Sequence, residues 1–98
     1  MRHIVNAVFV CNGQVLIARR ASHRNAYPGL WSFPGGHVKR NETLTDALVR
    51  EAREELGVTP TIFSFLGTIA DPNTRTTDPA TDYMYRVVGL EWRARSSR

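Results

Sequence analysis

Residues 43–57 carry the strongest structural signal in this sequence, because a helix start, a helix stop and an apolar stripe coincide there. Thr43, followed by Asp46, resembles a capping box, and Gly57 is typical of the position just past a helix end. Between these limits the apolar residues recur at helical spacing: Leu44, Leu48, Ala52 and Leu56. The segment therefore predicts one amphipathic helix that packs against a larger apolar surface.

Short strands and turns are predicted on either side of this helix. Strands are expected at residues 4–11, 15–18, 31–33, 62–69 and 83–92, with loops at 21–30 and 71–82. Asn12-Gly13 predicts a type I′ hairpin turn, because both central residues must adopt positive φ. Cys11, at the end of the first strand, is expected to be buried. The order β-β-β-α-β-β predicts one α/β domain over residues 1–92, followed by a basic tail at 93–98.

Length and composition narrow the choice of partners. The chain of 98 residues has room for one domain, and its single cysteine excludes an internal disulfide. No apolar run reaches the roughly 18 residues of a membrane helix, so a cytoplasmic protein without a membrane partner is expected. A net charge of +4 favours an anionic partner, either a nucleic acid or a phosphorylated small molecule. Because basic and aromatic residues do not alternate along a common strand, no stable nucleic-acid partner is expected.

Three glutamates share one face of the predicted helix, because Glu51, Glu54 and Glu55 fall at positions i, i+3 and i+4. Like charges at this spacing destabilise a bare helix by roughly 0.2–0.5 kcal/mol per pair. At the border of the apolar stripe, the carboxylates are also expected to be partly desolvated. A hard divalent cation resolves this conflict, because Mg²⁺ prefers carboxylate oxygens. A solvated charged helix face is the alternative interpretation.

Neighbouring residues offer the other parts of a metal and phosphate site. Gly35 and Gly36 permit close backbone approach, and a carbonyl there can serve as an oxygen ligand. Arg50 can hold a carboxylate without competing for the metal, although a simple ion pair with Glu54 is the alternative. Arg19 and Arg20 end the second predicted strand and could meet phosphates there, with ordinary surface arginines as the alternative.

The stretch from Gly36 to Val58 follows the spacing G-x5-E-x7-R-E-U-x-E-E-x-G-U, where U is Ile, Leu or Val, and it resembles the Nudix box. Ala52 is a small residue at one of the U positions. The run from Trp31 to Gly36 also resembles the family, especially its MutT-like members. The resemblance implies a Nudix-type mixed β-sheet with the box helix packed on one face.

The resemblance further implies metal-assisted hydrolysis of a nucleoside diphosphate linked to another group, with Mg²⁺ or Mn²⁺ as cofactor. The substrates would be nucleoside triphosphates or modified nucleotides. The implied metal ligands are Glu51, Glu54, Glu55 and the Gly35 carbonyl. The implied catalytic residues are Glu51, Arg50 and Glu54, in which Glu51 is a candidate for activating the water and Arg50 orients the glutamates. The implied substrate-binding residues are Arg20, Phe33, Gly36 and Glu42, although Glu42 would equally support the loop or an outer metal.

Family domains usually continue into a second long helix, for which this sequence has no room after its last predicted strand. One sheet face would then be uncovered, which favours homodimerisation, strand exchange or an incomplete chain. A catalytically weak nucleotide-binding or regulatory Nudix domain is therefore the second hypothesis. A basic nucleic-acid-binding module is a third.

Overall fold

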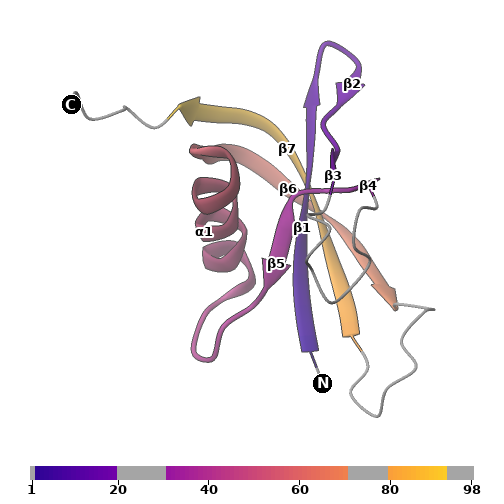
Figure 1. Ribbon diagram of the computed structural model, residues 1–98, viewed down its shortest axis with the longest axis vertical. Helices are drawn as coiled ribbons and strands as arrows, with labels where there is room; N and C mark the ends of the chain where they lie inside the picture. The colour runs from indigo at the N-terminus through magenta and orange to yellow at the C-terminus, as the bar shows by residue number, and fades with distance from the viewer. Residues whose placement is uncertain (1, 20–30, 71–79, 93–98) are drawn as a thin grey trace.

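The computed structural model describes residues 2–19, 31–70 and 80–92. The elements are β1 (Arg2–Cys11), β2 (Gln14–Val15), β3 (Ala18–Arg19), β4 (Trp31–Ser32), β5 (Gly35–His37), α1 (Leu44–Leu56), β6 (Val58–Ala70) and β7 (Ala80–Trp92). In Figure 1, α1 lies beside a sheet whose long strands are β1, β6 and β7. Within the described ranges α1 is the single helix, and it is too short and too polar to cross a membrane.

The sheet is mixed, as predicted. Its strand order is β2-β1-β7-β6, and β5 also pairs with β1. β1 and β7 run parallel, with Val5 opposite Tyr83 and Phe9 opposite Val87, whereas the other pairs in this sheet are antiparallel. β3 and β4 form a separate two-stranded sheet. The parallel pairing of β1 with β7 brings residues from the two ends of the chain into one core.

The core lies between α1 and one face of the sheet. The helix contributes three buried side chains, Ala47, Leu48 and Ala52. The strands contribute Val5, Ala7, Phe9, Val58, Tyr85 and Val87. Leu44 and Leu56, at the two ends of the predicted apolar stripe, are partly buried against this cluster. The predicted amphipathic helix is therefore confirmed, together with the face that it buries.

The predicted helix limits and the first turn are also confirmed. Thr43 caps α1, since its Oγ1 accepts a hydrogen bond from the Asp46 amide at 3.1 Å. Gly57 ends the helix in the left-handed region at φ 68°, where a glycine has no Cβ to clash. Asn12 at φ 52° and Gly13 at φ 76° form the turn between β1 and β2, as a type I′ hairpin requires.

Several strand predictions need correction. The strand expected at 15–18 is divided, because β2 pairs with β1 whereas β3 leaves that strand to pair with β4. β5 was not predicted, and β6 and β7 begin earlier than expected, at Val58 and Ala80. Cys11 is exposed rather than buried. The loop expected at 21–30, most of the loop expected at 71–82, Arg20 and the tail at 93–98 lie outside the described residues.

Strands β6 and β7 expose large apolar side chains. On β6 the large apolar side chains that are more than half exposed are Ile62, Phe65, Leu66 and Ile69. Trp92, at the end of β7, is 78% exposed. The uncovered apolar surface that the sequence predicts is therefore present within the described part of the sheet.

Candidate functional site

Arg50 lies in the middle of α1, and all five of its N–H donors have acceptors. Nη1 donates to Glu51 Oε1 and to Glu54 Oε1, each at 2.7 Å. Nε donates to Glu42 Oε2 at 2.7 Å, and Nη2 donates to Glu42 Oε1 at 3.0 Å and to the His37 carbonyl at 2.8 Å. A single guanidinium therefore holds three carboxylates and ties α1 to β5. Arg50 does more than pair with Glu54, which was the simpler interpretation.

Glu42 reaches Arg50 from the turn that precedes the helix. The turn is closed by two hydrogen bonds, from the Lys39 amide to Glu42 Oε1 at 2.9 Å and from the Glu42 amide to the Lys39 carbonyl at 3.1 Å. The Arg50 guanidinium, helped by the Lys39 amide, lowers the pKa of Glu42 from 4.5 to about 2. The same hydrogen bond is the main reason that the pKa of Arg50 is raised above its usual value. Glu42 is therefore an ionised anchor for Arg50.

Glu51 is the least exposed of the three helix glutamates, with 17% of its side chain accessible. Its carboxylate lies against Gly36, where a Cβ would come within 2.6 Å of both Glu51 oxygens. At Gly35 a Cβ would overlap the carbonyl oxygen of Val5, the residue that faces Gly36 across the β1–β5 ladder. The two glycines thus allow β5 to pair closely with β1 while Glu51 packs onto it.

Glu54 and Glu55 differ from this expectation of partial desolvation. The side chain of Glu54 is 54% exposed, and Glu55 is exposed as well. The last fully buried side chain of α1 is Ala52, and Glu54 and Glu55 lie beyond it toward the end of the helix. The prediction that all three carboxylates are partly desolvated is right for Glu51 and wrong for the other two.

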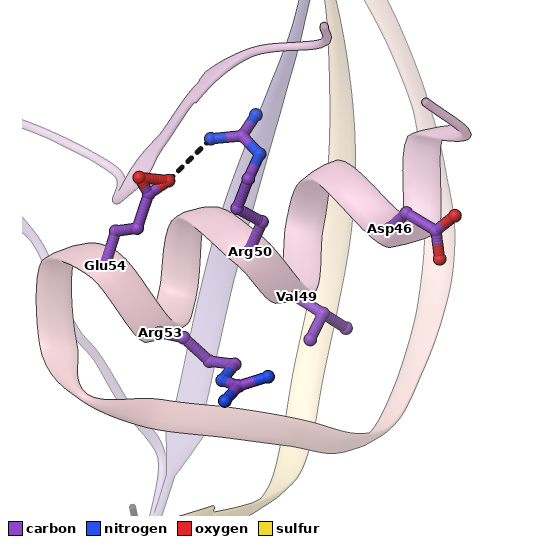
Figure 2. A pocket seen from close by; sticks show the side chains of 5 residues that line it. All are labelled: Asp46, Val49, Arg50, Arg53 and Glu54. Atoms are coloured by element: carbon purple, nitrogen blue, oxygen red, sulfur yellow. Dashed lines mark hydrogen bonds and ion pairs between the residues drawn. The ribbon is translucent and has the colours of Figure 1, made fainter. Parts of the chain in front are cut away.

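An open hollow lies along the outer side of α1. Its lining residues are Asp46, Val49, Arg50, Arg53 and Glu54. Figure 2 shows the Arg50 and Glu54 side chains directed toward each other, whereas Arg53 extends away from both. Glu51 does not line this hollow, so the carboxylates around Arg50, rather than the hollow, define the candidate site.

The oxygen atoms of this cluster are of the kind that a hard divalent cation prefers. Within residues 2–19, 31–70 and 80–92, no three His, Cys, Asp or Glu side chains already converge as a complete metal site. Glu51 and Glu54 nevertheless meet at one nitrogen of Arg50 through their Oε1 atoms, so the second oxygen of each is not needed for that ion pair. Carboxylate and carbonyl oxygens are the ligands that Mg²⁺ and Mn²⁺ prefer.

For the predicted substrate-binding residues, the structure gives fewer contacts. Phe33 is half-buried between β4 and β5, and Gly36 contacts Glu51. Direct contact of Arg20, Phe33, Gly36 or Glu42 with a nucleotide stays a prediction. Sequence analysis missed the His37 carbonyl and the Lys39 amide, which complete the Arg50 network. Both are backbone groups, which leave no signal in the sequence.

Comparison with known proteins assigns the chain to a family. The NUDIX domain family matches residues 1–96. Nucleoside triphosphatase NudI of Enterobacter sp. (strain 638) is 45% identical over 56 residues, which cover 57% of this chain and 40% of that relative. CTP pyrophosphohydrolase of Escherichia coli (strain K12) is 39% identical over 66 residues, which cover 67% of this chain and 48% of that relative. The chain therefore spans less than half the length of these two curated relatives.

A solved structure shares the fold. The MutT NUDIX hydrolase from Burkholderia pseudomallei superposes with a TM-score of 0.84 at 26% identity, over 96% of this chain and 71% of that one. Three glutamates of the motif, Glu42, Glu51 and Glu54, accept hydrogen bonds from Arg50 in this structure. By sequence and by fold, the chain belongs to the NUDIX family.

Proposed function

We propose that this chain is a metal-dependent nucleotide pyrophosphohydrolase that cleaves the pyrophosphate bond of nucleoside triphosphates or modified nucleotides by attack of water on phosphorus. The observation that carries this proposal is the Arg50 network, which orients Glu51 and Glu54 side by side. Two relatives, a nucleoside triphosphatase and a CTP pyrophosphohydrolase, support a nucleoside triphosphate as the substrate class.

Glu51, Glu54, Glu55 and the Gly35 carbonyl would hold the metal. Mg²⁺ or Mn²⁺ bound there would neutralise charge on the phosphate oxygens and lower the pKa of a bound water. Such a site also explains why three glutamates lie at a spacing that disfavours the isolated helix.

The chain's own residues would divide the remaining work. Arg50 keeps the Glu51 and Glu54 carboxylates in fixed rotamers without competing for a cation, and Glu42 fixes Arg50. Glu51, which is half-buried, is the candidate to accept a proton from the attacking water. Arg20 and Phe33 would contact the nucleotide.

Product analysis on a substrate panel tests this proposal. The panel would hold the common and 8-oxo dNTPs, ADP-ribose and diadenosine polyphosphates, each with Mg²⁺. We expect release of pyrophosphate or phosphate from a dNTP, of AMP and ribose 5-phosphate from ADP-ribose, or of two mononucleotides from a diadenosine polyphosphate. Glu54→Gln should lose about 100-fold or more of this activity, because even outer-shell partners of a metal cost about 10–100-fold. Glu91→Gln, an exposed glutamate on β7, is the matched control and should keep full activity.

The alternative is a catalytically weak nucleotide-binding or regulatory domain. It would be supported if no substrate turns over while Mg²⁺ and a nucleotide together raise the melting temperature. We also propose that the protein is cytoplasmic and forms a homodimer, and each of these two properties is tested by a separate measurement.

A further inference from the structure

Gly36 lies in β5, and the nearest neighbours of its missing side chain all belong to one functional group of α1, the Glu51 carboxylate. A Cβ built there would lie 2.5 Å from Glu51 Cδ and 2.6 Å from each Glu51 oxygen. These distances are below the 3.0 Å that real Cβ contacts respect. The Glu51 carboxylate therefore occupies the space that any other residue at position 36 would need.

Backbone conformation does not account for this glycine. Gly36 is absent from the described residues with positive φ, whereas Gly35, Gly57 and Gly67 are among them. The contact with Glu51 is consequently the physical reason for a residue without Cβ at this position.

The Glu51 carboxylate is also held by a hydrogen bond from Arg50. Arg50 Nη1 donates to Glu51 Oε1 at 2.7 Å, and Arg50 is itself held by Glu42 and the His37 carbonyl. His37 follows Gly36 in β5. The strand that contacts the Glu51 carboxylate therefore also binds Arg50, through the His37 carbonyl. A methyl group at position 36 would displace the Glu51 carboxylate from its present position and disturb its hydrogen bond with Arg50.

We propose that Gly36 is a positioning residue. Because it has no Cβ, it leaves the space that the Glu51 carboxylate occupies, and this packing fixes the carboxylate for metal binding. This role rests on the proposed function, and it differs from direct substrate contact because Gly36 acts through Glu51. A substitution of Gly36 should therefore lower the affinity of the protein for a divalent cation.

Gly89 provides a matched control for the steric effect. It also has no positive φ, and a Cβ there would lie 2.8 Å from Ile62 Cγ1 and 2.9 Å from Ile62 Cβ. Gly36→Ala and Gly89→Ala therefore insert the same methyl group into similarly tight places, one against a carboxylate and one against an apolar side chain. Only the first should change cation binding.

The test is Mn²⁺ affinity, measured by electron paramagnetic resonance of free Mn²⁺, with urea unfolding in the absence of metal as a parallel readout. The proteins are wild type, Gly36→Ala, Glu51→Ala, the double variant and Gly89→Ala. We expect Gly36→Ala to weaken Mn²⁺ binding by about 10–100-fold, and Gly89→Ala to bind like wild type. The double variant should bind Mn²⁺ no more weakly than Glu51→Ala alone, because the two changes act on one group.

The unfolding data cover the case in which Gly36→Ala folds poorly. Removing the Glu51 side chain opens the space, so the double variant should be no less stable than Glu51→Ala. The role of Gly36 would be overturned if the double variant is much less stable than Glu51→Ala, or if Gly36→Ala binds Mn²⁺ like wild type. It would also be overturned if the two substitutions weaken Mn²⁺ binding independently, so that their effects on the affinity multiply. Failure of wild type itself to bind Mn²⁺ would overturn the metal site and this role together. If all variants bind Mn²⁺ as expected but wild type hydrolyses no nucleotide, the result would count against the proposed activity alone.

Discussion

At the level of single residues, the order of the site depends on Arg50, whose planar group offers donors in five fixed directions. Lysine keeps the charge but cannot reproduce that fork, so Arg50→Lys leaves acceptors of Glu42, Glu51 and Glu54 without their partner. We expect the free energy of unfolding to fall by about 1–3 kcal/mol. Arg53→Lys, at an exposed position of the same helix, is the control and should change it little. Equal losses in both variants, measured by urea unfolding, would contradict the role of Arg50.

Glu42 makes stability depend on pH. Its pKa is lowered from 4.5 to about 2 in the folded chain, so the stability it contributes is fully present above pH 4.5 and is lost as the pH falls toward 2. Glu42→Gln should therefore be less stable than wild type at neutral pH, and the difference should shrink between those two values. Urea unfolding at several pH values measures it, with Glu91→Gln as the control. A difference that stays constant down to about pH 2 would speak against the Glu42–Arg50 ion pair.

Only part of this cluster could be predicted from the sequence. The pairs of Arg50 with Glu51 and Glu54 follow from helix geometry, because the residues are neighbours on one helix. The contact with Glu42 depends on how the turn at Lys39 folds back, and Asn41 in that turn adopts a φ of 64°. The exposure of Glu54 depends on where the sheet stops covering the helix, which no local pattern records.

At the level of elements, the limits of α1 were predictable because a cap is a local interaction. Thr43→Ala removes the acceptor for the Asp46 amide and should lower the free energy of unfolding by about 1 kcal/mol. Thr43→Ser keeps the hydroxyl and should retain most of the stability. Chemical denaturation of the three proteins measures this, and a serine variant as unstable as the alanine variant would refute the capping role.

The strands were harder to predict, because long-range pairing decides them. β5 contains two glycines, and it is a strand only because β1 accepts it at close range. β6 includes Pro60, which is tolerated because β6 ends the sheet and its register shifts just after that residue. Neither the partner strand nor the edge position is visible in the sequence.

At the level of the whole molecule, β6 exposes four large apolar side chains, Ile62, Phe65, Leu66 and Ile69, which is unusual for the surface of a monomer. Leu66, Ile69 and Met84 also border a small hollow there. We expect this surface to drive homodimerisation, visible as a doubling of mass with concentration in sedimentation experiments. Ile69→Ser should weaken the association, whereas Val15→Ser, at an exposed apolar position on β2, should not. A chain that stays monomeric at high concentration would contradict this prediction.

The central claim is that the helix glutamates Glu51, Glu54 and Glu55 bind the metal that supports pyrophosphate hydrolysis. Its most direct test is the initial rate of pyrophosphate release from a nucleoside triphosphate, titrated with Mg²⁺, for wild type, Glu54→Gln and Glu91→Gln. The predicted result is saturation with Mg²⁺ in wild type and in Glu91→Gln, together with a loss of about 100-fold or more in Glu54→Gln. Equal rates in wild type and Glu54→Gln at every Mg²⁺ concentration would contradict the account.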